Sequence, residues 1–110
     1  MNYLQGTVDV MILKTLSEGP SHGFGISKSI RERSEGAFRL EDAALYQALH
    51  RMESKGWLES EWGLSENNRR AKFYQMTSEG RQQLSIETRS WHRYAVAVFK
   101  VLDLQLETGP

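Results

Sequence analysis

The hydrophobic pattern of the chain changes its period twice, and this change limits the fold more than any other feature. Apolar residues recur every three or four positions up to Gly56, alternate with polar residues from Trp57, and return to helical spacing after Met76. A period of 3.6 is typical of a helix with one buried face, and a period of 2 of a strand. In a chain of 110 residues, this order predicts helices and a β-hairpin around a single modest core.

Glycine and proline mark the ends of the first two predicted helices. The first helix is predicted from Leu4 to Leu16, ahead of Gly19 and Pro20. Glycine suits the left-handed position after a helix, and proline cannot continue the helical hydrogen bonds. The second helix is predicted to follow Ser21, whose hydroxyl can cap it, and to end at Gly36.

A third helix is predicted between the carboxylate pair Glu41 and Asp42 and the glycine at position 56. Carboxylates at a helix start accept hydrogen bonds from free amides and suit the positive end of the helix dipole. The predicted core stripe of this helix consists of Leu45, Ala48, Leu49 and Met52. The outward face consists of Ala43, Tyr46, Gln47, His50 and, at its margin, Arg51.

The side chains on this outward face are of the types that read DNA. Glutamine can bond an adenine edge through two hydrogen bonds, and alanine can contact a thymine methyl group. Tyrosine, histidine and arginine can bind phosphates or bases. The same residue types are common on any solvated helix face, and Tyr46 has a second explanation as a ring packed over its own domain. The face alone therefore leaves both interpretations open.

A β-hairpin is predicted next, with strands at Trp57–Trp62 and Lys72–Met76 and a polar tip at Gly63–Ala71. Between Glu66 and Glu79 the sequence holds three cations and no acid. The basic group of the tip consists of Asn67, Asn68, Arg69, Arg70 and Lys72. Cations and amides of this kind bind phosphates. A basic tip can also be a solubilising loop, but its place beside a candidate recognition helix favours phosphate binding.

The last predicted helix runs from Glu79 to about Leu106 and is capped by Thr77 or Ser78. In its second half apolar residues cover most of the circumference, and a helix at the end of a small domain needs a second partner for such a surface. We expect that partner to be the same helix of another copy. The predicted interface residues are Trp91, Tyr94, Ala95, Val98 and Leu102. Alternatively, the aromatic pair Trp91 and Tyr94 lines a pocket between subunits for a planar apolar effector.

Three helices, a hairpin and a long helix are the element order of a winged helix-turn-helix protein. The predicted fold class is therefore mainly α (α+β), a winged helix-turn-helix with a long C-terminal dimerisation helix. Residues 1–77 are predicted to form the DNA-binding domain and residues 78–110 the dimerisation helix. In this architecture the third helix enters the major groove and the hairpin tip reaches the DNA backbone or minor groove.

Composition narrows the function further. Fourteen Lys and Arg balance 14 Asp and Glu, which argues against a protein that coats nucleic acid without selectivity. The absence of cysteine excludes a disulfide scaffold, a thiol nucleophile and a thiolate metal site. The sequence shows no export signal and no apolar run long enough to span a membrane, so a cytoplasmic protein is expected.

Neither an enzyme nor a metal or cofactor site is predicted. The three histidines, His22, His50 and His92, are far apart and lack a metal-ligand spacing. Glu41 and Asp42 are adjacent, so their carboxylates point in different directions and suit helix capping better than acid–base chemistry.

The sequence resembles the PadR family of bacterial transcriptional regulators, essentially from end to end. The resemblance is carried by Leu4-Gln5-Gly6-Thr7-Val8-Asp9-Val10-Met11-Ile12-Leu13, Gly19-Pro20-Ser21-His22-Gly23-Phe24, Ala44-Leu45-Tyr46-Gln47-Ala48-Leu49-His50-Arg51-Met52-Glu53, Gly56-Trp57-Leu58, Glu61-Trp62-Gly63 and Asn67 through Thr77. It implies a homodimeric winged-helix repressor whose C-terminal helix forms the dimer, with a planar aromatic inducer or drug bound near that helix in some relatives.

One stretch departs from the family pattern. The family's recognition segment commonly reads Thr or Ser, Leu, Tyr, Pro, Ala, Leu, whereas this chain has Ala44 at the first position and Gln47 at the fourth. The change removes a hydroxyl phosphate donor and adds a base-reading amide, so the operator sequence is expected to differ. The sequence thus predicts a homodimeric repressor that binds double-stranded operator DNA. The alternative is a winged-helix module that binds protein instead of DNA.

Overall fold

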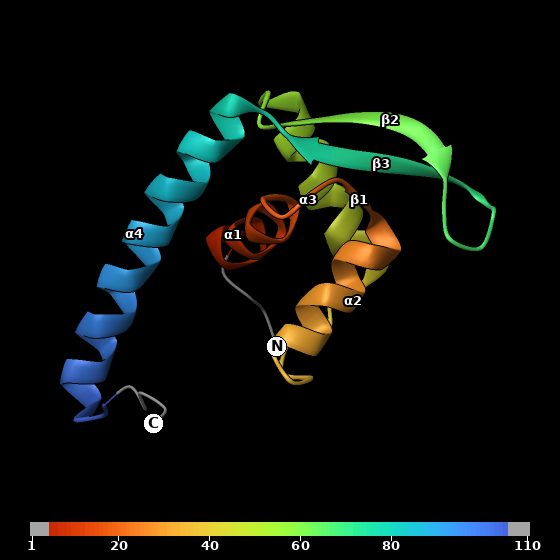
Figure 1. Ribbon diagram of the computed structural model, residues 1–110. Coiled ribbons are helices and arrows are strands. Elements are labelled where there is room, and N and C mark those ends of the chain that lie inside the picture. The colour runs from red at the N-terminus through yellow and green to blue at the C-terminus, as the bar shows by residue number, and fades with distance from the viewer. Residues whose placement is uncertain (1–4, 106–110) are drawn as a thin grey trace.

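The computed structural model describes residues 5–105, and Figure 1 shows the predicted order of helices and hairpin. Leu4 and Leu106, which the sequence analysis placed in the first and last helices, lie outside the described residues. The one element that was not predicted is β1, a two-residue strand. In chain order the elements are α1 (Gln5–Leu16), β1 (Ser21–His22), α2 (Gly23–Arg33), α3 (Asp42–Ser54), β2 (Leu58–Leu64), β3 (Arg70–Met76) and α4 (Ser78–Leu102).

The caps of α2 and α3 differ from the prediction. Ser21 does not cap α2, because it belongs to β1 and pairs with Tyr74 of β3. His22 caps α2 instead, and its Nδ1 accepts a hydrogen bond of 3.1 Å from the amide of Gly25. Glu41 occupies the cap position of α3, but its side chain accepts no capping hydrogen bond. The carboxylate prediction at α3 is therefore wrong for Glu41, while Asp42 lies in the first turn near the positive helix end.

The three strands form an antiparallel sheet in the order β1-β3-β2. In the hairpin, Leu58 pairs with Met76 and Leu64 with Arg70. The strands are therefore longer than predicted, and the connecting tip shortens to residues 65–69. Arg70, predicted in the tip, consequently belongs to β3 together with Lys72, as predicted for that lysine. The sheet register therefore fixes the face on which each of the two side chains lies.

The core lies where α1, α2 and α3 meet beneath the base of the hairpin. Figure 1 shows α1 in the centre, with α2 and α3 on one side and α4 on the other. The four predicted core residues of α3 are all buried, which confirms that stripe. The fully buried side chains are Ile12, Leu13, Ile26, Leu45, Leu49 and Met52.

The last helix, α4, begins at the predicted cap Thr77. Its hydroxyl accepts a 3.0 Å hydrogen bond from the amide of Gly80 and donates one of 2.7 Å to the carbonyl of Gly56. The indole nitrogen of Trp91 donates to the hydroxyl of Thr7 on α1, at 3.2 Å. The helix ends at Leu102, four residues before the predicted end, where the backbone turns left-handed. Figure 1 shows its second half extending away from the other helices.

Candidate nucleic-acid interface

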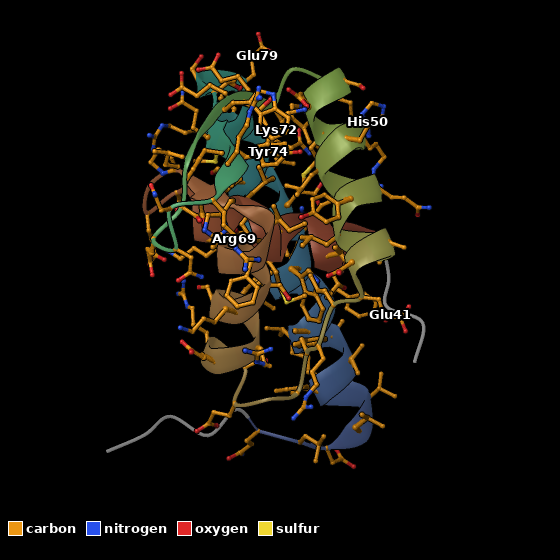
Figure 2. All side chains as sticks on the ribbon, turned by 90° about the vertical axis from the view of Figure 1, so that its right-hand side faces the viewer. Glu41, His50, Arg69, Lys72, Tyr74 and Glu79 are labelled. Atoms are coloured by element: carbon orange, nitrogen blue, oxygen red, sulfur yellow. The ribbon has the colours of Figure 1, made fainter. Side chains whose placement is uncertain are left out.

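The face of α3 opposite the core stripe is open to solvent. Ala43, Tyr46, Gln47 and His50 are all exposed, as the helical period predicted. Within residues 5–105, Gln47 and His50 form no side-chain hydrogen bond or ion pair. Both side chains are therefore free to bind a partner. Figure 2 shows α3 on the right, with His50 pointing away from the hairpin.

Tyr46 is only partly available, because its ring lies against the start of α2. It is 50% exposed, and a Cβ atom added at Gly23 would lie 2.6 Å from its hydroxyl oxygen and 2.9 Å from Cζ. Packing over its own domain therefore accounts for part of the ring, and the exposed part remains on the outward face. Gly23 leaves the space in which this tyrosine sits.

Arg51 points away from the outward face. Its guanidinium forms an ion pair with Asp9 of α1, which is buried. Its Nε is also buried, and no described residue accepts a hydrogen bond from it. Arg51 therefore joins α3 to α1, and its guanidinium is bound to Asp9 instead of extending from the outward face.

The buried Asp9 has a consequence for stability. Burial raises the pKa of its carboxyl above the ordinary value of 3.8. The effect of burial on this pKa is larger than the opposite effect of the Arg51 guanidinium, which lowers it. A carboxyl whose pKa is higher in the folded chain contributes stability below its unfolded pKa and loses that contribution as pH rises through the folded pKa. The wild type therefore loses this contribution as pH rises from 3.8.

We expect the free energy of unfolding of the Asp9→Asn variant, minus that of the wild type, to increase from about pH 3.5 to about pH 7. Asparagine keeps the size and a hydrogen-bond acceptor for Arg51 but cannot ionise. Urea denaturation of both proteins at the two pH values measures the difference. A relative loss over the same range would show that Arg51 stabilises the charged carboxylate by more than burial disfavours it.

The hairpin register sorts charge between the two faces of the sheet. Directly paired residues share a face. One face carries two cations and no acid: Leu58, Ser60, Trp62, Leu64, Arg70, Lys72, Tyr74 and Met76. The other carries two acids and no cation: Glu59, Glu61, Gly63, Ala71, Phe73 and Gln75. We call the first of these the α3-side face, because the hydroxyl of Ser60 bonds Glu53 of α3 at 2.5 Å.

The predicted hairpin cations differ in their surroundings. The ammonium of Lys72 lies 3.5 Å from the carboxylate of Glu53, and Figure 2 shows Lys72 and Tyr74 between the hairpin and α3. The guanidinium of Arg70 lies over the ring of Trp62, 4.7 Å from its centroid. Arg69 is exposed at the tip. Arg69 and Arg70 are therefore freer than Lys72 to bind an anion.

The two asparagines also differ. Asn68 has a positive φ of 58°, and its amide donates to the carbonyl of Ser65 at 2.9 Å. Asparagine tolerates this left-handed conformation, so Asn68 shapes the turn. Asn67 is exposed beside it.

Two large apolar side chains of this region are exposed, which the sequence pattern does not indicate. Trp62 is 59% exposed and Leu64 is 67% exposed, both on the α3-side face. The alternating pattern placed Trp62 on the same side as the buried Leu58, but the hairpin extends beyond the core before it reaches Trp62. The exposure of Trp62 depends on how far the strands extend beyond the helices beneath them. A local sequence pattern does not indicate that distance.

The second half of α4 carries a separate apolar surface. Tyr94, Val101 and Leu102 are exposed, and Val101 reaches 83%. Ala95 and Val98 are half-buried. Trp91 is half-buried against α1 through Thr7, and its ring meets Tyr94 edge-on with centroids 5.6 Å apart. Part of the Trp91 side chain thus packs within its own protomer, whereas the side chains of Tyr94 and Leu102 are exposed to solvent.

An apolar pocket of the protomer lies elsewhere. A cavity of about 460 Å³ opens between α1, the end of α2 and α4, and its lining includes Met11, Ile30, Phe38 and Thr88 but neither Trp91 nor Tyr94. Among residues 5–105 no group of three metal-ligating side chains occurs. No helix in the described part of the chain has both the length and the apolar character needed to cross a membrane.

Three helices, of which the third is exposed, followed by a wing-like hairpin and a long last helix define a regulator of the winged-helix class. The chain belongs to the PadR-like family of transcriptional regulators, whose family model matches residues 12–86. This confirms the expected family and fold, and the family is one of regulators and not of enzymes.

Individual relatives agree with this assignment. A transcriptional regulator from Clostridium thermocellum superposes with a TM-score of 0.79 at 32% identity, covering 87% of this chain and 90% of that one. A PadR family regulator from Clostridium difficile gives a TM-score of 0.71 at 33% identity, covering 86% and 96%. The uncharacterized protein X of Lysinibacillus sphaericus is 30% identical over 104 residues, which cover 94% of this chain and 92% of that protein.

Proposed function

We propose that this regulator is a homodimeric repressor that binds operator DNA sequence-specifically. The observation that carries the proposal is the charge-sorted hairpin, whose cationic face contacts α3 through Lys72 and Glu53. The acids Glu59 and Glu61 lie on the opposite face of the sheet. A DNA duplex approaching α3 therefore meets the positive side of the hairpin, although the whole chain has no net charge.

Each element has its own part in binding. The N-terminal half of α3 enters the major groove, where Gln47 reads an adenine edge and Ala43 contacts a thymine methyl group. Tyr46 and His50 contact neighbouring bases or phosphates. The hairpin residues Asn67, Asn68, Arg69, Arg70 and Lys72 bind the flanking backbone, with Asn68 shaping the turn and Lys72 exchanging Glu53 for a phosphate.

We expect Arg70→Ala and Gln47→Ala to weaken DNA binding in different ways. Arg70→Ala removes a phosphate contact, so affinity falls for all sequences and the slope of log K against log salt decreases by about 0.9. Gln47→Ala removes a base contact, so the preferred sequence changes, with a loss of about 1–3 kcal/mol at the matching base pair. Mobility-shift titrations at two salt concentrations on a selected operator measure both effects.

Arg93→Ala is the matched control, because this exposed cation lies on α4, away from the hairpin. It should leave affinity and salt slope unchanged. Equal and sequence-independent losses in Arg70→Ala and Gln47→Ala would contradict the assigned roles. A wild-type protein with no salt-dependent shift on any DNA fragment would favour the alternative, a winged-helix module that binds protein.

The dimer is supported by the exposed apolar surface of α4. This surface lies within residues 78–110, which the sequence predicts to form the dimerisation helix. Two protomers joined along this helix present two copies of α3, which fit major grooves about 10 base pairs apart. A dimer that covers both half-sites represses by excluding other proteins from the promoter and needs no further contact.

An effector site at the dimer interface is part of the proposal. The edge-on pair Trp91 and Tyr94 offers aromatic walls of the kind that bind planar apolar ligands. Titration of a planar aromatic dye, followed by tryptophan fluorescence in the wild type and in Tyr94→Ala, tests this site. Equal dye affinity in both proteins would exclude it.

A further inference from the structure

The outer part of the α3-side face carries an apolar platform that the protomer leaves uncovered. Trp62 and Leu64 are 59% and 67% exposed, although both lie on the face whose inner residues, Leu58 and Met76, are buried. Exposed apolar surface that is contiguous and rimmed by polar residues marks a binding surface more often than an isolated exposed side chain does. The platform therefore needs an occupant.

Arg70 is held on this platform by its neighbours. Its Cα pairs with Leu64 across the strands, while its guanidinium reaches back diagonally to lie 4.7 Å from the centroid of the Trp62 ring. A guanidinium over an indole face is attracted by the ring quadrupole. The stack restricts a long and otherwise flexible side chain, so less conformational entropy is lost when Arg70 binds an anion.

The charge around the platform indicates the occupant. The α3-side face has cations at two positions, Arg70 and Lys72, and no acid of its own. The nearest carboxylate that contacts it, Glu53, is bound to Lys72 and Ser60 toward the base of the hairpin. A DNA backbone alternates anionic phosphates with apolar deoxyribose rings, which matches an apolar platform that holds a fixed cation.

We infer that Trp62 is a positioning residue for Arg70, and that Trp62 and Leu64 pack against deoxyribose where Arg70 binds the adjacent phosphate. The inference rests on the proposed DNA-binding function and extends it to residues outside the basic group. The apolar contact releases no counterions, so its contribution to affinity does not vary with salt. The wing therefore binds DNA through one salt-dependent and one salt-independent component.

Six proteins test this inference on one operator at two salt concentrations: wild type, Trp62→Phe, Trp62→Ala, Leu64→Ser, Arg70→Gln and the double variant Trp62→Ala/Arg70→Gln. We expect Trp62→Ala to lower affinity about 5-fold with an unchanged salt slope. Trp62→Phe, which keeps an aromatic face, should stay within about 2-fold of wild type. Arg70→Gln should lower the slope by about 0.9.

The double-mutant cycle separates positioning from simple contact. If Trp62 positions Arg70, Trp62→Ala lowers affinity less in the Arg70→Gln background than in the wild type. An equal loss in both backgrounds overturns the positioning role, and wild-type affinity in both Trp62→Ala and Leu64→Ser overturns the platform. Thermal melting controls for folding, since substitutions at these exposed positions should leave Tm unchanged.

Failure of the inference differs from failure of the proposed function. If the wild type binds the operator with a steep salt dependence but Trp62→Ala and Leu64→Ser both bind equally well, only the inference is overturned. If the wild type binds no DNA fragment, DNA binding is overturned and the inference with it.

Discussion

Replacing Gly80 by alanine is expected to lower the free energy of unfolding by about 3 kcal/mol, the upper part of the range for overpacking. Gly80 is buried in the first turn of α4. An added Cβ would overlap the carbonyl oxygen of Trp57 and lie 2.7 Å from Cγ of Met76. The Trp57 backbone cannot easily move away, because its carbonyl accepts the amide of Thr77 and its own amide donates to Met52, both at 3.0 Å.

Urea denaturation followed by circular dichroism measures this loss. Gly6→Ala is the matched control, because Gly6 also lies in a first helical turn. Among residues 5–105 its Cβ would meet only the Glu87 carboxylate, at an ordinary 3.6 Å. That variant should be neutral or stabilised by up to about 1 kcal/mol through helix propensity. Similar stability of the two variants would mean that α4 can shift away from the hairpin without loss.

Leu102→Asp is expected to convert the dimer into monomers and to raise its dissociation constant by about 100-fold. Leu102 is 57% exposed in the protomer, so the substitution should barely change the stability of the folded monomer. In the proposed interface the same position is buried, and an unpaired carboxylate there is strongly unfavourable. Because a monomer covers one half-site, operator affinity should fall along with dimerisation.

Sedimentation at several protein concentrations measures the dimer, and the mobility shift on the same operator measures DNA binding. Lys100→Asp is the control, since it introduces the same carboxylate two residues earlier, on nearly the opposite side of the helix. It should remain a dimer. A Leu102→Asp protein that stays dimeric would show that subunits associate through another surface than α4.

Most of the fold could be predicted because its elements are encoded by local patterns. The core stripe of α3 follows from helical spacing, and the cap at Thr77 follows from a hydroxyl placed before a new helix. The errors occur where a distant segment competes with a local signal. Ser21 has the chemistry of a cap, but β3 engages its backbone as a strand, and His22 takes the capping role.

The candidate site could be predicted less completely for the same reason. Helical spacing identifies Gln47 and His50 as outward residues, and the structure exposes both. The same spacing leaves Arg51 at the margin, and only the position of Asp9 on a neighbouring helix turns it inward. Trp62 was missed because alternation indicates a face but not where along a strand the underlying core ends.

By itself the sequence determined the order of the helices and the hairpin, the core stripe of α3 and the basic group of the hairpin, because each depends on residues close together in the chain. The PadR resemblance follows from several such local motifs in the right order. The tertiary structure decided which of those residues share a surface. Antiparallel register places Arg70 and Lys72 on one face and Glu59 and Glu61 on the other. A chain of zero net charge thereby acquires a positive side next to α3, since strand pairing and not composition sets where each charge lies.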